Sequence, residues 1–404
     1  MTVRLRMNSS SQDLLRQALA LALGAAISLG LARFSYALLL GPMRADLGWS
    51  YFTAGAMNTA NAAGYLLGAL WVPRWIARRG PRSALIGGGL ATAGLLALHG
   101  LVSSEALLGL LRLLAGAASA ATFVSGGLLA ARLGSRAAGA MSASLVLGLY
   151  YGGTGLGIIV SALLVPAFAG TGEAFGWQPA WPALGAVALL MTLLMGWGTA
   201  ADAPLGASTG VAAPLRWRRF GFALAGYFLF GLGYIGYMTF IVTLLREQQL
   251  ESAVITAFYV TLGLGVVASS WLWAGLLQRW RGGQPMALLN GLLALATLLP
   301  VLSTRPAAVF ISGALFGSVF LSVVAASTAV VRHNLPAVAW SRGIGVFTAV
   351  FAVGQIAGPS LVGLIADGPG GLARGLAVSA AVLVLGAVLA LGQRPLGDTR
   401  EPGA

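Results

Sequence analysis

Two arginines lie inside long apolar stretches, where a charge requires a functional or structural reason. Arg33 falls within the stretch 17–40 and Arg112 within 106–130, at similar depths from the same predicted membrane face. A charge inside a bilayer costs roughly 2.5–3.5 kcal/mol even on lenient scales, so such a residue faces a cavity or a partner. No Asp or Glu lies deep in any apolar stretch. We therefore expect an anionic solute to supply the missing charge, because a planar guanidinium binds a carboxylate with two hydrogen bonds.

Each arginine also has a purely structural interpretation. The guanidinium can bond helix-end carbonyls, extend to the outer headgroups, or reach Asp46 or Glu105 near the outer surface. Glu105 lies two turns from Arg112 on the same expected helix, which favours the structural interpretation there. For Arg33 we favour solute binding, because polar neighbours share its helix face.

Polar and aromatic residues of the inner helices complete the predicted binding site. Tyr36 stands at i,i+3 from Arg33, and Tyr234 and Tyr237 occupy the equivalent positions in the second half. Charge in one half and phenols in the other suit an amphipathic organic anion. The other predicted binding residues are Asn61, Arg112, Tyr151 and Gln355. Interhelical packing or hydrogen bonding is the alternative role for the tyrosines and amides.

The composition excludes most other chemistry. The chain has no lysine and no cysteine, so Schiff bases, disulfides and thiolate metal sites are ruled out. Its two histidines, His99 and His333, are far apart, and we predict neither an enzyme nor a cofactor or metal site. Charged residues are 8% and hydrophobic residues 58% of the chain, whereas about 25% of a soluble domain is charged. The chain is therefore a multi-pass membrane protein, with the lipid bilayer and a small solute as its partners, no nucleic-acid partner, and a monomeric state expected.

The hydropathy of the sequence predicts the number of membrane-spanning helices that position the candidate binding residues. A bilayer core needs about 20 apolar residues per helix. The sequence predicts an all-α integral membrane fold with twelve spans: 17–40, 51–72, 84–103, 106–130, 138–165, 181–200, 220–245, 253–276, 285–302, 306–330, 343–366 and 375–392.

Arginine placement predicts the orientation. Of the 24 positive residues, two lie within spans, eighteen fall in the segments that share a side with the N-terminus, and only Arg44, Arg246, Arg305 and Arg374 fall on the other side. Because positive loops stay cytoplasmic, both termini are expected inside, in a bacterial inner membrane.

The two halves of the sequence resemble each other. Residues 29–36 match 230–237, 112–116 match 313–317 and 153–157 match 354–358, each at an offset of 201 residues. We predict two parallel six-helix bundles, 1–200 and 219–404, joined by a cytoplasmic linker, 201–218. Repeats of this kind place the substrate site near the midplane between them.

Glycine pairs spaced by four residues predict close helix packing. The pairs are Gly148 with Gly152, Gly153 with Gly157, Gly313 with Gly317 and Gly354 with Gly358. The glycines at 153, 157 and 358 are also candidates for conformational change, since Gly358 precedes Pro359 and a proline can kink the helix. Close packing without any further role is the alternative.

These features resemble the major facilitator superfamily over nearly the whole chain. Its cytoplasmic loop pattern G-x-x-x-D-R-x-G-R-R/K is matched by Arg78, Gly80 and Arg82, which the resemblance assigns to the inner gate. Pro73 and Ala77 replace the first glycine and the acid, so the usual charge relay lacks its carboxylate. Residues 30–36 and 60–68 are similar to the YbfB/YjiJ-type bacterial subgroup. The resemblance implies a transporter that works by alternating access.

Energy coupling and rival functions follow from what the spans contain. Proton-driven relatives usually hold a titrating residue within the membrane, and none is evident here. We expect the substrate's own carboxyl to carry any proton, or transport by exchange or facilitated diffusion, with His99 and Asp367 as alternative proton sites. The rival within transport is efflux of hydrophobic or cationic compounds. A receptor or scaffold that moves no solute is the rival outside it.

Overall fold

The protein is helical throughout the part of the chain that the structure describes. The computed structural model describes residues 9–136, 142–169, 175–199, 217–336 and 339–396, and these residues contain no strand. This confirms the predicted all-α fold. Residues 201–216 of the predicted linker, the first four residues of the predicted span 138–165, and the arginines at 4, 6, 216 and 400 lie outside the described residues.

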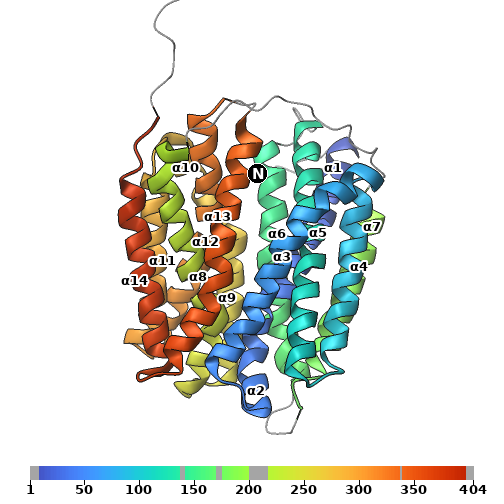
Figure 1. Cartoon of the computed structure of the whole chain (residues 1–404). Coiled ribbons are helices and arrows are strands. Elements are labelled where there is room, and N and C mark those ends of the chain that lie inside the picture. The colour runs from blue at the N-terminus through green and yellow to red at the C-terminus, as the bar shows by residue number, and fades with distance from the viewer. Residues whose placement is uncertain (1–8, 137–141, 170–174, 200–216, 337–338, 397–404) are drawn as a thin grey trace, which may run out of the picture. The chain divides into compact units, whose positions relative to one another are not determined.

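The chain divides into two compact units. The first comprises Met1–Leu47 and Ala63–Ala207, and the second comprises Gly48–Ala62 and Ser208–Ala404. The helices of the first unit are α1 Ser9–Ala25, η1 Ala26–Phe34, α2 Tyr36–Leu47, most of α3 Tyr51–Arg79, α4 Pro81–His99, α5 Glu105–Arg136, α6 Ala143–Phe168 and α7 Ala180–Gly198. Figure 1 labels all of these except η1. The first dozen residues of α3 belong to the second unit, although the helix itself is continuous.

The second unit begins after the central segment. Its further helices are η2 Trp217–Phe220, α8 Gly221–Glu247, α9 Ser252–Leu272, α10 Ala274–Arg279, α11 Gln284–Leu302, α12 Pro306–Asn334, α13 Trp340–Ala366 and α14 Gly371–Leu391. Grouping the consecutive pieces α1–η1–α2, η2–α8 and α9–α10 gives twelve rods among the described residues. Within the described part of the chain, ten segments are long and apolar enough to cross a membrane, and α3 and α4 are not among them.

Local sequence explains several helix boundaries. Gly80 adopts a φ of 80°, a backbone angle that residues with a side chain rarely adopt. Pro81 follows at the first helical position of α4. Pro306 likewise begins α12, and the Ser142 side chain accepts a hydrogen bond from the Leu145 amide to cap α6. These residues therefore fix where α4, α6 and α12 begin.

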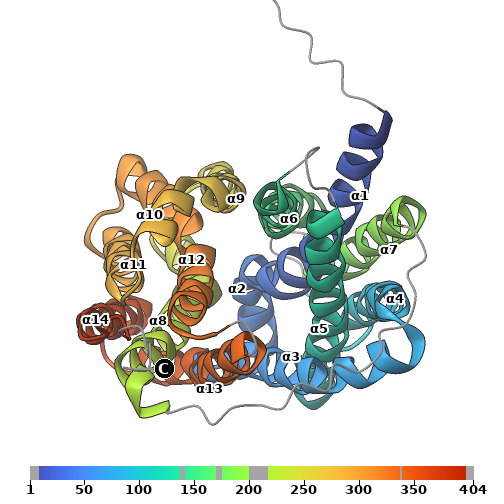
Figure 2. The ribbon, with the colours of Figure 1, turned by 90° about the horizontal axis from the view of Figure 1, so that it is seen from above.

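The two units repeat the same packing. In the first, α4 packs against α5 and α7, and α6 packs against η1; the helices α4, α5 and α7 lie side by side in Figure 2. In the second, α11 packs against α12 and α14, and α13 packs against α8. Gly64 faces the Leu113 carbonyl and Gly265 faces the Ala314 carbonyl, both pairs again 201 residues apart. The duplication in the sequence is therefore a duplication of structure.

Candidate solute-binding site

The first membrane rod changes its winding where it carries Arg33. Residues Ala26–Phe34 form a π-helix, and every one of them is buried. The Ser35 amide bonds the Gly30 carbonyl, five residues back, at 3.1 Å. Short π-helical insertions are rare and occur frequently at functional sites. The winding rotates the following residues relative to an ordinary α-helix and thereby sets the direction of the Arg33 side chain.

Glycines of α6 hold this segment in place. A Cβ on Gly157 would meet the Ala26 carbonyl oxygen at 2.3 Å, and one on Gly30 would meet the Gly157 Cα at 2.4 Å. On Gly153 it would meet the Ala22 carbonyl oxygen at 2.0 Å. Only hydrogen fits at these positions, so η1 and α6 touch backbone to backbone. The predicted close-packing role of Gly153 and Gly157 is confirmed; their role in conformational change stays a prediction.

Arg33 is a buried cation with unused hydrogen-bonding capacity. Its side chain is 3% exposed, and Nε and Nη2 have no hydrogen-bond partner among the described residues. The guanidinium carbon lies 6.0 Å from the centre of the Tyr65 ring. All six carboxylates of the described residues are solvent-exposed: Asp13, Asp46, Glu105, Glu247, Glu251 and Asp367. A buried charge without a counter-charge is costly, and an anion that accepts its free N–H groups would offset that cost.

Arg112 is also buried, but it is bonded to the protein. Its Nη1 donates to the Ala32 carbonyl at 2.9 Å, and its guanidinium lies 4.6 Å from the centre of the Tyr36 ring. Asp46, one of its two suggested acidic partners, accepts hydrogen bonds from Trp177 Nε1 at 2.8 Å and from the backbone amide of Phe175. Arg112 therefore ties α5 to the end of η1, beside Arg33, and adds its positive charge to the same region.

An aromatic group lies beside these arginines in the first unit. Phe123 of α5 stands 6.3 Å from Tyr65, 5.6 Å from Tyr150 and 6.0 Å from Tyr151, measured between ring centres. Tyr150 is fully buried and its hydroxyl donates to the Phe123 carbonyl, whereas Tyr151 is 39% exposed. Tyr151 is thus the ring of the pair that is accessible. Phe123 was not among the predicted site residues; its place three turns after Arg112 on one helix face was the available signal.

In the second unit, Tyr234 and Gln355 meet. The Gln355 side-chain amide donates to the Tyr234 hydroxyl, and both residues are at least 95% buried. The Tyr234 ring stacks on Phe230 at 4.7 Å and on Phe351 at 5.8 Å between centres. The cluster joins α8 to α13, and it forms a polar pair within an aromatic wall.

Tyr237 has a different environment from Tyr234, one turn away. Its ring stacks on Phe316 at 4.0 Å, and its hydroxyl bonds the Ser312 hydroxyl at 2.6 Å. Ser312 in turn bonds the Ala296 carbonyl. The Tyr237 side chain is fully buried between helices, so these contacts favour the packing alternative for it.

The asparagines of α3 belong to the second unit. Asn61 is 1% exposed, and Asn58 donates from Nδ2 to the Thr239 hydroxyl of α8 at 2.7 Å. Interhelical hydrogen bonding, the alternative considered for these amides, is therefore found for Asn58.

The beginning of α3 packs closely on α13. A Cβ on Gly55 would meet the Pro359 carbonyl oxygen at 2.2 Å, and Thr59 donates to the Ile356 carbonyl at 2.7 Å. The Asp367 carboxylate accepts hydrogen bonds from the first two amides of α3, at 2.7 and 2.9 Å. Asp367, considered above as a proton site, is thus an N-terminal cap for α3. Gly358 packs against the Leu232 carbonyl of α8, so it too is a close-contact glycine.

The three predicted gate residues lie between α3 and α4. Arg78 is exposed, and Gly80 has the positive φ described above. Arg82 donates to the carbonyls of Gly196 at 2.7 Å and Thr199 at 3.1 Å, which lie at the end of α7. Arg82 therefore stabilises a helix C-terminus within its own unit, and its predicted gating role stays a prediction.

Buried His99 is held by its neighbours. Its ring stacks on Trp181 at 4.4 Å between centres, and Nδ1 lies 2.7 Å from the Leu95 carbonyl. Within the described part of the chain, no three His, Cys, Asp or Glu side chains gather into a possible metal site.

Twelve helical rods in two repeated units, ten of them long and apolar enough to cross a membrane within the described residues, agree with the family match and define a polytopic transporter of the major facilitator type. Residues 25–391 match the family described as uncharacterised MFS-type transporter YbfB, and the chain belongs to that family. The predicted resemblance to the superfamily and to this subgroup is therefore confirmed.

Solved structures share the fold. An inward-facing, occupied bacterial homologue of the human lysosomal transporter Spinster is 14% identical with a TM-score of 0.70, covering 95% of this chain and 96% of the other. The nucleoside transporter NupG is 15% identical with a TM-score of 0.64, covering 95% and 99%. No curated protein sequence matches the chain. At these identities the likeness shows the fold alone.

Proposed function

We propose that this transporter moves an amphipathic organic anion, such as a carboxylate, by alternating access, and that Arg33 is the residue that binds the anionic group. The observation that supports the proposal most strongly is the Arg33 side chain itself, which is 3% exposed with two nitrogens unbonded within the described residues. A protein that only needed a structural cation would satisfy its N–H groups, as Arg112 does at the Ala32 carbonyl.

The chemistry of guanidinium favours a planar anion. Two parallel N–H groups match the two oxygens of a carboxylate, and charge-assisted bonds of this kind are about twice as strong as neutral ones. Nε and Nη2, the two unbonded nitrogens, are a pair from which Arg can donate to both oxygens of one carboxylate. A lipophilic cation would face two buried positive charges at this site and is disfavoured electrostatically.

The aromatic residues beside Arg33 favour an organic substituent on the anion. Tyr65, Phe123 and Tyr151 offer ring surface in the first unit, and Tyr151 is accessible. Aromatic surfaces bind apolar and aromatic groups, whereas a small inorganic ion would gain nothing from them. We also propose that the protein resides in a bacterial inner membrane as a monomer with both termini cytoplasmic, as the arginine distribution predicts.

A thermal-shift experiment with matched probes tests the proposal. Purified protein is heated with benzoate, hexanoate or benzenesulfonate, with benzamide as the neutral analogue of benzoate, and with benzyltrimethylammonium as a cation. Ligands that bind the folded state raise the melting temperature by mass action. We expect at least one anion to stabilise the wild type, and Arg33→Gln to lose that shift.

The control is Arg305→Gln, which removes an exposed arginine at the start of α12. It should keep the full anion-induced shift. If Arg33→Gln retains wild-type stabilisation by anions, the site assignment is wrong. Stabilisation by the cation alone would support the rival function, export of cationic compounds.

A further inference from the structure

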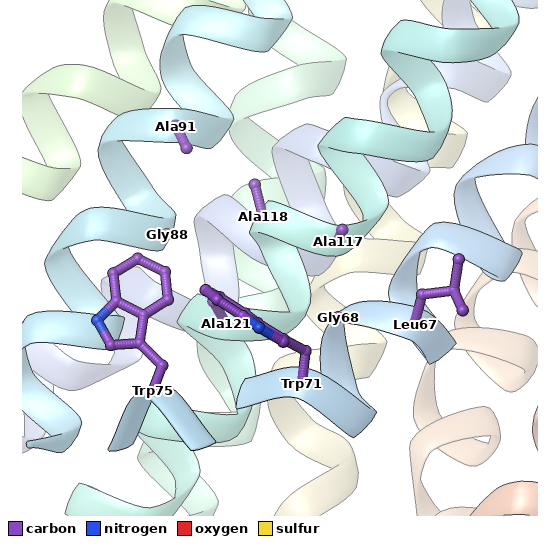
Figure 3. A pocket seen from close by; sticks show the side chains of 9 residues that line it. All are labelled: Leu67, Gly68, Trp71, Trp75, Gly88, Ala91, Ala117, Ala118 and Ala121. Carbon is purple, nitrogen blue, oxygen red and sulfur yellow. The ribbon is translucent and has the colours of Figure 1, made fainter. Parts of the chain in front are cut away.

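A groove opens on the first unit between α3, α4 and α5. Its volume is about 300 Å³, and Figure 3 shows the side chains that form it. Two indoles, Trp71 and Trp75, stand on the α3 edge, with ring centres 5.2 Å apart. The floor is made of small residues of α4 and α5: Gly88, Ala91, Ala117, Ala118 and Ala121. The side chains leave a channel with an almost entirely carbon surface.

The groove is accessible from outside the helix bundle. Trp71 is 52% exposed and Leu67 is 56% exposed, and both are large apolar side chains on a helix of a membrane protein. Val72, Ile76, Ala84 and the floor residue Ala121 form a buried hydrophobic cluster, and Trp75 packs against it. An exposed apolar channel of this kind in a membrane protein faces the acyl chains of lipids.

One end of the groove is strongly basic. Beyond the two indoles, α3 carries Arg74, Arg78 and Arg79, all exposed. Arg74 is three residues after Trp71, and Arg78 and Arg79 are three and four residues after Trp75, so these arginines lie on the helix face that carries the indoles. Tryptophan belongs at the boundary between acyl chains and headgroups. The basic end therefore stands where lipid phosphates would lie.

We propose that this groove binds an anionic phospholipid. One acyl chain lies along the small-residue floor beside Trp71 and Trp75, and the headgroup phosphate is bound by Arg74 and Arg78. Clusters of exposed arginine beside a membrane helix attract anionic headgroups, at roughly fivefold in affinity for each arginine. A zwitterionic phospholipid offers the same acyl chain without the net charge, and a sterol offers neither a phosphate nor an acyl chain.

Among its described residues, the second unit does not repeat this pair of indoles. Trp273 corresponds to Trp71 at an offset of 202 residues in this region, but its Nε1 donates to the Ser318 carbonyl at 2.7 Å, and Leu277 stands at the same offset from Trp75. Exposed arginines do follow, at Arg279 and Arg281. The second unit thus has comparable charge without the paired indoles, which makes it an internal control.

Tryptophan quenching by brominated lipids tests the proposal. The full-length protein in a neutral detergent is titrated with phosphatidylglycerol or phosphatidylcholine whose acyl chains are dibrominated. We expect phosphatidylglycerol to quench at a concentration at least fivefold lower. The double variant Trp71→Phe/Trp75→Phe removes two of the 11 tryptophans and should lose this high-affinity component.

Three further variants separate charge from shape. Arg74→Gln with Arg78→Gln should make the two lipids equivalent, whereas Arg279→Gln with Arg281→Gln should leave the preference intact. Ala91→Leu fills the groove from α4 and should weaken quenching by both lipids. Equal quenching by the two lipids in the wild type, or an unchanged preference without the two indoles, would overturn the proposal.

Discussion

Replacing Gly157 by alanine should push η1, the helix that carries Arg33, away from α6. A Cβ at this position would lie 2.3 Å from the Ala26 carbonyl oxygen and 2.8 Å from the Gly30 Cα, whereas ordinary contacts begin at 3.4 Å. The obstructing atoms are all backbone, so no side-chain rotation relieves the clash. The η1 segment must move away from α6.

The energetic effect has two parts of opposite sign. Alanine favours a helix over glycine by about 1 kcal/mol at any interior helical position. Overpacking costs about 1–3 kcal/mol. Gly94→Ala, in α4 of the same unit, provides the first part alone, because a Cβ there would have no neighbour within 4 Å. The difference between the two variants therefore isolates the packing cost.

Unfolding of both variants in an SDS titration, followed by tryptophan fluorescence, measures this difference. We expect Gly157→Ala to unfold with a free energy about 1–3 kcal/mol below that of Gly94→Ala. It should also show a reduced melting-temperature shift with benzoate or whichever probe anion stabilises the wild type, since Arg33 moves with η1. Equal stability of the two variants would refute the reasoning about backbone contact.

Two further variants test the contacts at helix ends. Arg82→Gln removes the hydrogen bonds to the end of α7 and should lower the unfolding free energy by about 1–3 kcal/mol, while Arg78→Gln, at an exposed position, should stay within about 0.5 kcal/mol of the wild type. Equal losses in both would rule out the capping role. Asp367→Ala removes the cap of α3 and should lower the unfolding free energy by about 0.5–2 kcal/mol. It should also speed hydrogen–deuterium exchange at the amides of Tyr51 and Phe52. Unchanged exchange at these two amides would contradict the capping role.

The helical fold could be predicted from sequence because hydropathy along a single chain reports membrane burial directly. Even the short predicted span 285–302, which contains Pro300, matches α11 at Gln284–Leu302. The repeat could be predicted because backbone contacts demand glycine at fixed positions in both halves, as at Gly64 and Gly265. These features depend on residue size and apolarity alone.

The local geometry of the site could not be predicted in the same way. A π-helical turn contains one more residue than an α-helical turn, and this does not change the hydropathy of the segment. The sequence of Ala26–Phe34 therefore predicts an ordinary α-helix. Tyr234 and Tyr237 share a periodic pattern, yet one bonds Gln355 and the other Ser312, because their partners come from helices distant in the sequence. The periodicity of a sequence identifies which residues share one face of a helix, but it does not identify the side chains of other helices that pack against that face.

The same limit applies to α3 and to the two arginines. Nothing in the sequence of α3 marks Ala62 as the point where the helix passes from one compact unit to the other. Arg33 and Arg112 look alike in an apolar stretch, but Arg112 donates to the Ala32 carbonyl and lies against the Tyr36 ring, whereas two nitrogens of Arg33 have no partner among the described residues. The sequence could therefore identify both arginines as candidate binding residues. Only the structure distinguishes the arginine that is hydrogen-bonded to the protein from the one with unused donors.

Uptake into proteoliposomes tests the central claim most directly. The radiolabelled form of the anion that best stabilises the wild type is supplied outside, and initial uptake is compared for wild type, Arg33→Gln and Arg305→Gln. Removing a charge-assisted bond worth about 1.5–3 kcal/mol should lower uptake at least tenfold in Arg33→Gln and leave Arg305→Gln unchanged. Uptake by Arg33→Gln at the wild-type rate would contradict the claim that Arg33 binds the transported anion.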